Sequence, residues 1–248
     1  MEGNDMEERD FDIIVVGSGC AGAVAAYVAA SAGKSVLVVE RGEYAGAKNM
    51  TGGRIYTHSL RQVFPDFEKE APLERKITHE RIAMMDPLSQ MAIDFTSAEL
   101  AQIKNESYSV FRAPCDQWLA EKAASAGAEY IYGIAVEELL KDDLGSICGI
   151  RAGEDRITAH VVIDAEGTNA LLSERSLGNP RPSSSRMAVG IKEVFELPEQ
   201  TIADRFLLPV GEGAAMLFVG YCTHGKVGGG FLYTNKESIS LGLVATIS

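Results

Sequence analysis

The chain has 248 residues, enough for one large domain or two small ones, and its 46% hydrophobic and 23% charged residues exclude a wholly disordered chain. Its 23 Lys and Arg against 35 Asp and Glu give a formal net charge of −12. A surface this acidic repels phosphate backbones, so the composition argues against general nucleic-acid binding.

Cysteine and histidine spacing gives no sign of a disulfide framework or a metal centre. The four cysteines lie far apart without a C-x-x-C pair, and the four histidines show no H-x-x-H spacing. The N-terminal segment has no apolar signal region, and the longest apolar run, residues 23–30, is too short to cross a bilayer. The sequence therefore predicts a cytoplasmic protein with reduced thiols and no metal site.

The first predicted elements form a strand–helix–strand unit. The apolar run at 11–16 predicts a strand, the Ala-rich stretch 21–32 a helix that ends at Gly33, and the run at 35–39 a second strand. Both strands are apolar on both faces, as a buried parallel sheet requires. This pattern predicts a βαβ unit.

The middle of the chain predicts a loop, short strands and one helix. Residues 41–65 are rich in Gly and polar residues, which is typical of a long functional loop. Short antiparallel strands are then expected within 77–95 and a strand at 108–112. Helical spacing of apolar residues predicts a helix at 114–126.

The second half predicts mostly strands. The expected strands, which include a three-stranded meander followed by a buried strand, are 127–131, 135–140, 148–151, 156–159 and 161–164. Residues 180–186 have the composition of a linker. Apolar and polar residues then alternate through 187–248, which predicts an antiparallel sheet.

The most specific motif is Gly17-Ser18-Gly19-Cys20-Ala21-Gly22, a G-x-G-x-x-G sequence that follows a predicted strand and opens a predicted helix. Glu40 follows about 20 residues later, at the end of the next strand. In such a fingerprint the glycines permit a tight turn, close approach of a pyrophosphate and close packing of the helix. An acidic residue at position 40 binds ribose hydroxyls and disfavours a 2′-phosphate, which argues against NADP.

The fingerprint suits both FAD and NAD, but later residues favour FAD. Glu40-Arg41-Gly42 leads into the Gly-rich loop, whereas a simple NAD domain would continue into another helix. Residues 161–172 predict a second cofactor-contacting element, with an apolar strand, an acidic residue, Gly and a helix start. An NAD-dependent dehydrogenase is therefore the weaker interpretation.

The chain resembles two-dinucleotide-binding-domain flavoproteins of the glutathione-reductase class. Within this class it resembles the electron-transfer flavoprotein–quinone oxidoreductase family, and in particular its FixC-type members. Besides the fingerprint, the segments that carry the resemblance are residues 46–54, 71–75 and 228–236.

The resemblance implies an α/β fold with an FAD/NAD(P)-binding Rossmann-like domain, made of a parallel sheet plus a β-meander, and an inserted antiparallel β-rich substrate domain. The predicted boundaries are 11–76 and 106–180 for the FAD-binding domain. Residues 77–105 and 186–248 form the predicted substrate or acceptor domain.

The resemblance also implies FAD as the cofactor. The predicted contacts are Gly17, Gly19, Cys20, Ala21, Gly22, Glu40, Arg41, Lys48, Asn49, Gly52, Gly53, Arg112, Val136, Glu166 and Gly167. At position 166 the family usually has Asp. No catalytic residue is assigned, because flavin chemistry belongs mostly to the cofactor.

The chain departs from the family in two respects. A third FAD motif, Gly-Asp, is absent from the sequence, and family members continue well beyond 248 residues. We therefore expect the chain to correspond to the N-terminal portion of such a protein, with the substrate domain incomplete.

The resemblance implies an FAD-dependent oxidoreductase in an electron-transfer chain. Its expected donor is an electron-transfer flavoprotein, and its expected acceptor is a ferredoxin-like protein or a quinone. Peripheral contact with the inner membrane face is part of this expectation. Two alternatives stay open: an FAD-dependent prenyl-lipid reductase or aromatic hydroxylase, and a truncated, flavin-free remnant without activity.

Overall fold

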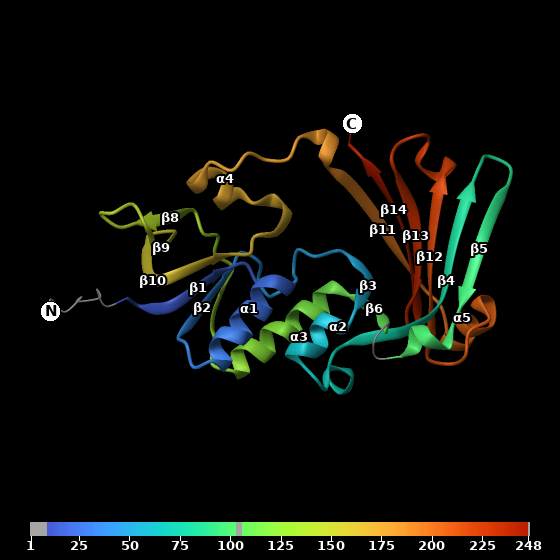
Figure 1. The fold of residues 1–248 in the computed structure, drawn as a ribbon, viewed down its shortest axis with the longest axis horizontal. Coiled ribbons are helices and arrows are strands. Elements are labelled where there is room, and N and C mark those ends of the chain that lie inside the picture. Colours follow the sequence, from blue (N-terminus) through green and yellow to red (C-terminus); the bar gives the residue numbers. More distant parts are fainter. Residues whose placement is uncertain (1–8, 103–105, 248) are drawn as a thin grey trace. The chain divides into compact units, whose positions relative to one another are not determined.

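The computed structural model describes residues 9–102 and 106–247, which fold into two compact units (Figure 1). Unit 1 holds the described residues of Met1–Asn49 and Asp116–Arg181, and unit 2 those of Met50–Cys115 and Pro182–Ser248. Across the described part of the chain, none of the helices combines the length and apolar character needed to span a membrane.

Unit 1 is built on a six-stranded sheet in the order β7-β2-β1-β10-β9-β8. Its strands are β1 (Phe11–Val16), β2 (Val36–Glu40), β7 (Glu129–Tyr132), β8 (Glu138–Lys141), β9 (Ile147–Ala152) and β10 (Asp155–Asp164). Its helices are α1 (Cys20–Ser31), α3 (Arg112–Ser125), whose start lies in unit 2, the 3-10 helix η3 (Gly167–Asn169) and α4 (Leu171–Leu177). Strands β7, β2, β1 and the end of β10 run parallel, and β10, β9 and β8 form an antiparallel meander. The predicted parallel sheet plus meander is confirmed.

Strand β10 joins two elements that the sequence analysis separates. It pairs antiparallel with β9 over Asp155–Thr158 and parallel with β1 from Ala159 to Asp164. A strand carries backbone donors and acceptors towards both sides, so it can change partners without a break. The prediction of a buried strand at its end is also wrong, because Val161 is 50% exposed.

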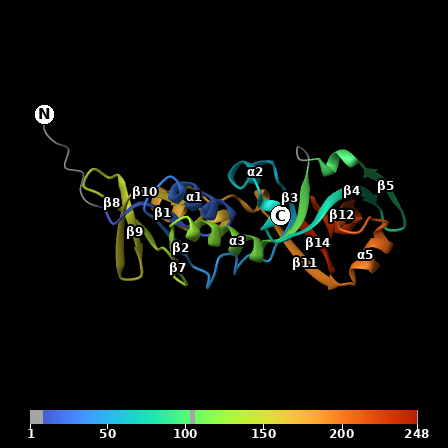
Figure 2. The ribbon, with the colours of Figure 1, turned by 90° about the horizontal axis from the view of Figure 1, so that it is seen from below.

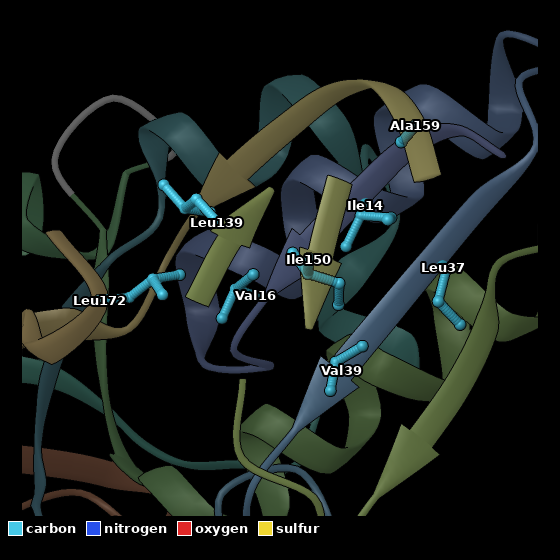
Figure 3. Packing of buried hydrophobic residues seen from close by; sticks show 8 residues of the cluster. All are labelled: Ile14, Val16, Leu37, Val39, Leu139, Ile150, Ala159 and Leu172. Carbon is cyan, nitrogen blue, oxygen red and sulfur yellow. The ribbon is translucent and has the colours of Figure 1, made fainter. Parts of the chain in front are cut away.

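Both faces of the parallel strands in unit 1 are covered, which explains why these strands are apolar throughout. Val15 and Val38 point to the helical face, where they pack with Ala26 of α1 and Ala123 of α3; these helices lie side by side (Figures 1 and 2). Figure 3 shows the opposite face, where residues of β1 and β2 meet the meander and α4. The labelled residues of that cluster are Ile14, Val16, Leu37, Val39, Leu139, Ile150, Ala159 and Leu172. Burial of each large aliphatic side chain contributes about 1.5–3 kcal/mol.

Unit 2 is built on one sheet in the order β11-β14-β13-β12-β4-β6-β3, with β5 paired to β4. Its strands are β3 (Gly52–Tyr56), β4 (Leu73–Met85), β5 (Gln90–Thr96), β6 (Ser107–Phe111), β11 (Ala188–Glu196), β12 (Glu212–Gly220), β13 (Gly228–Thr234) and β14 (Ser238–Thr246). Its helices are α2 (His58–Val63), α5 (Glu199–Phe206) and the 3-10 helices η1 (Phe67–Lys69), η2 (Ala98–Ala101), η4 (Ser184–Arg186) and η5 (Tyr221–Thr223). All strand pairs are antiparallel except β12 with β4. The predicted antiparallel β-rich part is therefore present.

Three features of unit 2 differ from the sequence analysis. The expected loop 41–65 contains β3 and α2, and the expected sheet region 187–248 contains α5. The third difference concerns the boundaries between the two parts of the chain.

The unit boundaries differ from the predicted domain boundaries. Strand β3 pairs with β6, and β6 pairs with β4, so residues 50–76 and 106–115 belong to unit 2. Residues 103–105, within the predicted substrate domain, lie outside the described residues. The functions assigned to the two domains stay predictions.

A fully buried arginine holds the strands of unit 2 together. Arg75, with 0% exposure, donates from Nε to the carbonyl oxygen of Asn235 at 2.6 Å. Its Nη atoms donate to the carbonyl oxygens of Glu212 and Lys236, both at 3.0 Å, and to that of Glu199 at the start of α5 at 3.3 Å. One guanidinium therefore satisfies four backbone acceptors from three segments far apart in sequence.

These contacts bring together two of the segments that carry the family resemblance, 71–75 and 228–236. The carboxylate of Glu74 accepts the Lys236 N–H at 2.8 Å, beside the bonds from Arg75. Both segments therefore have a structural role in joining β4 to the β13–β14 turn.

We predict that Arg75→Met lowers the free energy of unfolding by about 3 kcal/mol or more, because it leaves several buried carbonyl groups without donors. Urea unfolding followed by circular dichroism measures this loss. Arg81→Met is the matched control: its side chain is 36% exposed and pairs with Asp94 at the surface, so the expected loss is about 1 kcal/mol or less. Equal losses in the two variants would contradict the role given to Arg75.

Candidate functional site

The fingerprint forms a narrow backbone turn between β1 and α1. Gly17 has φ +96°, a conformation that favours glycine, and a Cβ placed on it would lie 2.6 Å from the carbonyl oxygen of Ala165. A Cβ placed on Gly22 would lie 1.9 Å from the carbonyl oxygen of Gly17. A side chain at either position would therefore force apart the loop, the start of α1 and the end of β10.

The first turn of α1 has features that allow it to bind an anion. The N-cap residue Gly19 is extended, with φ −78° and ψ −174°, and has no side chain to accept the N–H groups of the first turn. That turn also contains no acidic residue. No N-cap side chain occupies the N–H groups of this turn, so they are able to bind a pyrophosphate.

Glu40 links the fingerprint to the loop after β2. Its Oε2 accepts the Ser18 N–H, and its Oε1 accepts the Gly42 N–H, both at 2.7 Å. Each carboxylate oxygen can accept a second hydrogen bond, so the group is held in place and still able to bind ribose hydroxyls. The predicted acidic position at the end of β2 thus lies beside the phosphate loop.

Asp116 is a site residue that the sequence analysis missed. It lies on α3 with 0% exposure. Its Oδ1 accepts the Cys20 thiol at 3.1 Å, and its Oδ2 accepts the side-chain amide of Asn49 at 2.5 Å. This carboxylate therefore connects the start of α1 to the loop after β2. The available signal was an aspartate in the first turn of the helix predicted at 114–126.

The second predicted motif has a helix-capping role. The Glu166 carboxylate accepts the N–H of Leu172, in the first turn of α4, at 2.6 Å. Gly167 has φ +75°, and a Cβ placed on it would meet no atom within 4 Å. A glycine is therefore favoured here by the backbone conformation of the turn and not by close packing. Val136 packs, partly buried, against the cluster of Figure 3.

The remaining predicted contacts lie in two groups. Ala21, Arg41 and Lys48 are exposed residues of unit 1. Gly52, Gly53 and Arg112 belong to unit 2, where the Arg112 N–H donates to the carbonyl oxygen of Thr51 at 3.0 Å.

Unit 1 by itself brings together the fingerprint, Glu40 and Asn49. The close backbone approaches at Gly17 and Gly22, with the open first turn of α1, fit the pyrophosphate of a dinucleotide.

The comparison with known families agrees with this geometry. Residues 12–174 match the family model described as FAD dependent oxidoreductase. The chain belongs to this family. The match spans the fingerprint, Glu40, Asp116 and the Glu166 motif. It confirms FAD as the predicted cofactor, in preference to NAD.

Several named proteins are similar to this chain over most of its length. Protein FixC of Salmonella typhi is 51% identical over 239 residues, and Protein FixC of Escherichia coli K12 is 49% identical over the same length. A probable electron transfer flavoprotein-quinone oxidoreductase, YdiS of E. coli K12, is 48% identical over 240 residues. The alignments cover 96% of this chain and 56% of each relative. The predicted FixC-type resemblance is confirmed, and the chain spans little more than half the length of these relatives.

Solved structures confirm the fold class. A geranylgeranyl bacteriochlorophyll reductase-like protein from Thermoplasma acidophilum superposes with a TM-score of 0.77 at 20% identity, covering 96% of this chain and 57% of that one. The myxobacterial halogenase CndH gives a TM-score of 0.70 at 19% identity, covering 95% and 53%. At this identity the likeness shows the shared fold and not a shared substrate.

We predict that Asp116→Asn lowers the free energy of unfolding by about 1–3 kcal/mol. An amide at this buried position keeps one acceptor but turns an NH₂ group towards a second donor, Cys20 or Asn49. Thermal unfolding measures the change. Asp155→Asn, at an exposed position in unit 1, is the control and should be neutral. A neutral Asp116→Asn would show that this carboxylate does not tie the two segments together.

Proposed function

We propose that this chain supplies the FAD-binding machinery of a FixC-type oxidoreductase that passes electrons from an electron-transfer flavoprotein to a further acceptor. The observation that carries the proposal is the phosphate loop, where close backbone approach at Gly17 and Gly22 leaves room only for glycine. The half-identical relatives named Protein FixC support the same function.

In this proposal the N–H groups at the start of α1 bind the FAD pyrophosphate, and Glu40 accepts hydrogen bonds from the ribose hydroxyls of its adenosine half. Asp116 holds the loop in place through Cys20 and Asn49. The bound flavin supplies the redox chemistry, while the protein binds and orients it. The negative charge of Glu40 repels a 2′-phosphate, so the site discriminates against NADP.

The other predicted contacts belong to the same proposal. Arg41 and Lys48 are exposed cations near the end of β2, and Gly52, Gly53 and Arg112 lie where β3 meets the start of α3 in unit 2. The Gly52 backbone pairs with Phe111, directly before Arg112. This pairing places Gly52 and Arg112 close together along the backbone of unit 2.

For partners, we propose an electron-transfer flavoprotein as donor and a ferredoxin-like protein or a quinone as acceptor. The donor is supported by the name of the relative YdiS, a probable electron transfer flavoprotein-quinone oxidoreductase. Because a quinone is lipid-soluble, the proposal includes peripheral contact with the inner membrane face. The alternatives, a prenyl-lipid reductase or an aromatic hydroxylase, predict flavin reduction by NAD(P)H without any flavoprotein donor.

The first experiment is flavin uptake. We expect the purified chain, incubated with FAD and desalted, to retain flavin absorbance bands, and denaturation to release FAD. Retained flavin should then be reduced by reduced electron-transfer flavoprotein and not by NAD(P)H. A folded, colourless chain would contradict FAD binding, and rapid reduction by NAD(P)H alone would favour the alternatives.

We predict that Glu40→Gln weakens FAD binding at least tenfold, which is about 1.4 kcal/mol. The substitution directs an NH₂ group at a backbone N–H and removes one acceptor for ribose. Fluorescence titration of the apoprotein with FAD measures the dissociation constant. Glu43→Gln, at an exposed position in the following loop, is the control and should bind FAD as the parent does. Matching dissociation constants for both variants would remove Glu40 from the site.

A further inference from the structure

Strand β5 leaves one edge of the unit 2 sheet without a strand partner among the described residues. It pairs with β4 on one side and stands at the margin of the sheet (Figure 1). Every residue of β5 is exposed. Its large apolar residues Met91, Ile93 and Phe95 are 61%, 67% and 53% exposed. An exposed edge with apolar side chains is a place where a further strand can add to a sheet.

Hydrogen bonds at both ends of the β4–β5 hairpin show which backbone groups of β5 face outward. The Asp86 N–H donates to the carbonyl oxygen of Ser89 at 3.0 Å, and the Ser97 N–H donates to that of Thr78 at 3.4 Å. Bonded residues alternate along an antiparallel strand, so the odd-numbered residues of β5 bond to β4. The residues whose N–H and C=O groups point away from β4 are therefore Gln90, Ala92, Asp94 and Thr96.

This edge lacks the features that usually prevent strand addition. Edge strands are commonly protected by lysine, proline or a β-bulge. Strand β5 contains neither residue type, and its register with β4 is continuous. Its one charged side chain, Asp94, accepts hydrogen bonds from Arg81 through both carboxylate oxygens. The charge is therefore balanced within the hairpin and does not repel a second copy of the same edge.

We propose that two copies of this chain associate by antiparallel pairing of β5 with β5, across a two-fold axis at Ile93. A two-fold axis uses the same surface in both copies, and strand edges that pair across it run antiparallel. Because β4 occupies the other edge of each β5, the assembly closes at two copies. The proposal lies entirely within unit 2 and does not depend on FAD binding.

The apolar face of β5 is complementary to itself in this register. Ile93 is opposite Ile93 of the second copy, and Met91 is opposite Phe95. The large apolar side chains therefore meet across the new strand pair, where such cross-strand contacts stabilise a sheet. The odd-numbered residues form the non-hydrogen-bonded pairs, because their own backbone groups are directed at β4.

The other face of β5 is also matched. Ala92 is opposite Asp94 of the second copy, and Gln90 is opposite Thr96, so the outward backbone groups of these residues bond to each other. The two Asp94 carboxylates are not directly opposed. An axis moved to Asp94 would place them opposite each other, which is unfavourable. Charge and side-chain size therefore select the axis at Ile93.

The first test is the association of the purified chain, measured by analytical ultracentrifugation over a range of protein concentrations. We expect a reversible dimer that Ala92→Pro weakens at least tenfold. Proline removes the outward N–H of Ala92 and no bond to β4, a position where edge strands accept proline. Ala92→Ser keeps this N–H and is the matched control, with an expected change of less than threefold. A monomeric parent chain, or a dimer that Ala92→Pro does not weaken, would overturn the proposal.

A second measurement tests the register and serves if Ala92→Pro does not fold. The Cα atoms of a non-hydrogen-bonded antiparallel pair are about 4.5 Å apart, which a disulfide can span. We therefore expect Ile93→Cys to form a disulfide between copies on mild oxidation, identified by mass spectrometry. Leu88→Cys is the control. Leu88 is 98% exposed, but in this register it lies about 30 Å from its counterpart. No disulfide in Ile93→Cys, or equal cross-linking of both variants, would contradict pairing at Ile93 and overturn the proposal.

A lipid surface is the competing partner for the exposed apolar side chains of β5. The parent chain is therefore also sedimented with vesicles of phosphatidylcholine and phosphatidylglycerol. A chain that is monomeric in solution and sediments with the vesicles would assign these side chains to a membrane, and the proposed dimer would be wrong.

Discussion

The close approach of three backbone segments at the carboxyl end of β1 is the constraint on which the site depends. Gly22 packs against the Gly17 carbonyl and Gly17 against the Ala165 carbonyl, at distances that leave no space for a Cβ. This packing draws α1, the β1 loop and the end of β10 to one point. The N-terminus of α1 is thereby fixed beside Glu40, whose carboxylate bonds to two backbone N–H groups. Burial on both faces of β1 and β2 keeps the arrangement rigid.

Local pattern was enough to predict the first βαβ unit and the meander, because both follow from the spacing of apolar residues within short segments. It failed where pairing is decided by distant partners. Strand β3 contains two glycines and is stabilised by β6, about 50 residues away, so composition alone suggests a loop. The single strand β10 was divided because its two halves have different neighbours. Helix α5 was missed because its eight residues lie within a region of strand-like alternation.

The same distinction applies to the site. The fingerprint and Glu40 were predictable because their roles depend on spacing within one βαβ unit. Asp116 and Arg75 were not assigned roles, because their partners are 67 to 161 residues away in the sequence. Family resemblance indicated that segments 71–75 and 228–236 matter, but it could not say why. Their contacts show a structural reason: buried donors from one segment satisfy backbone acceptors of the other.

Each unit thus has its own buried charged group that joins segments far apart in the sequence. In unit 1 the Asp116 carboxylate holds Cys20 and Asn49, and in unit 2 the Arg75 guanidinium holds the β13–β14 turn against β4. Both side chains are buried and make their hydrogen bonds within the fold, so their role is to hold distant segments together.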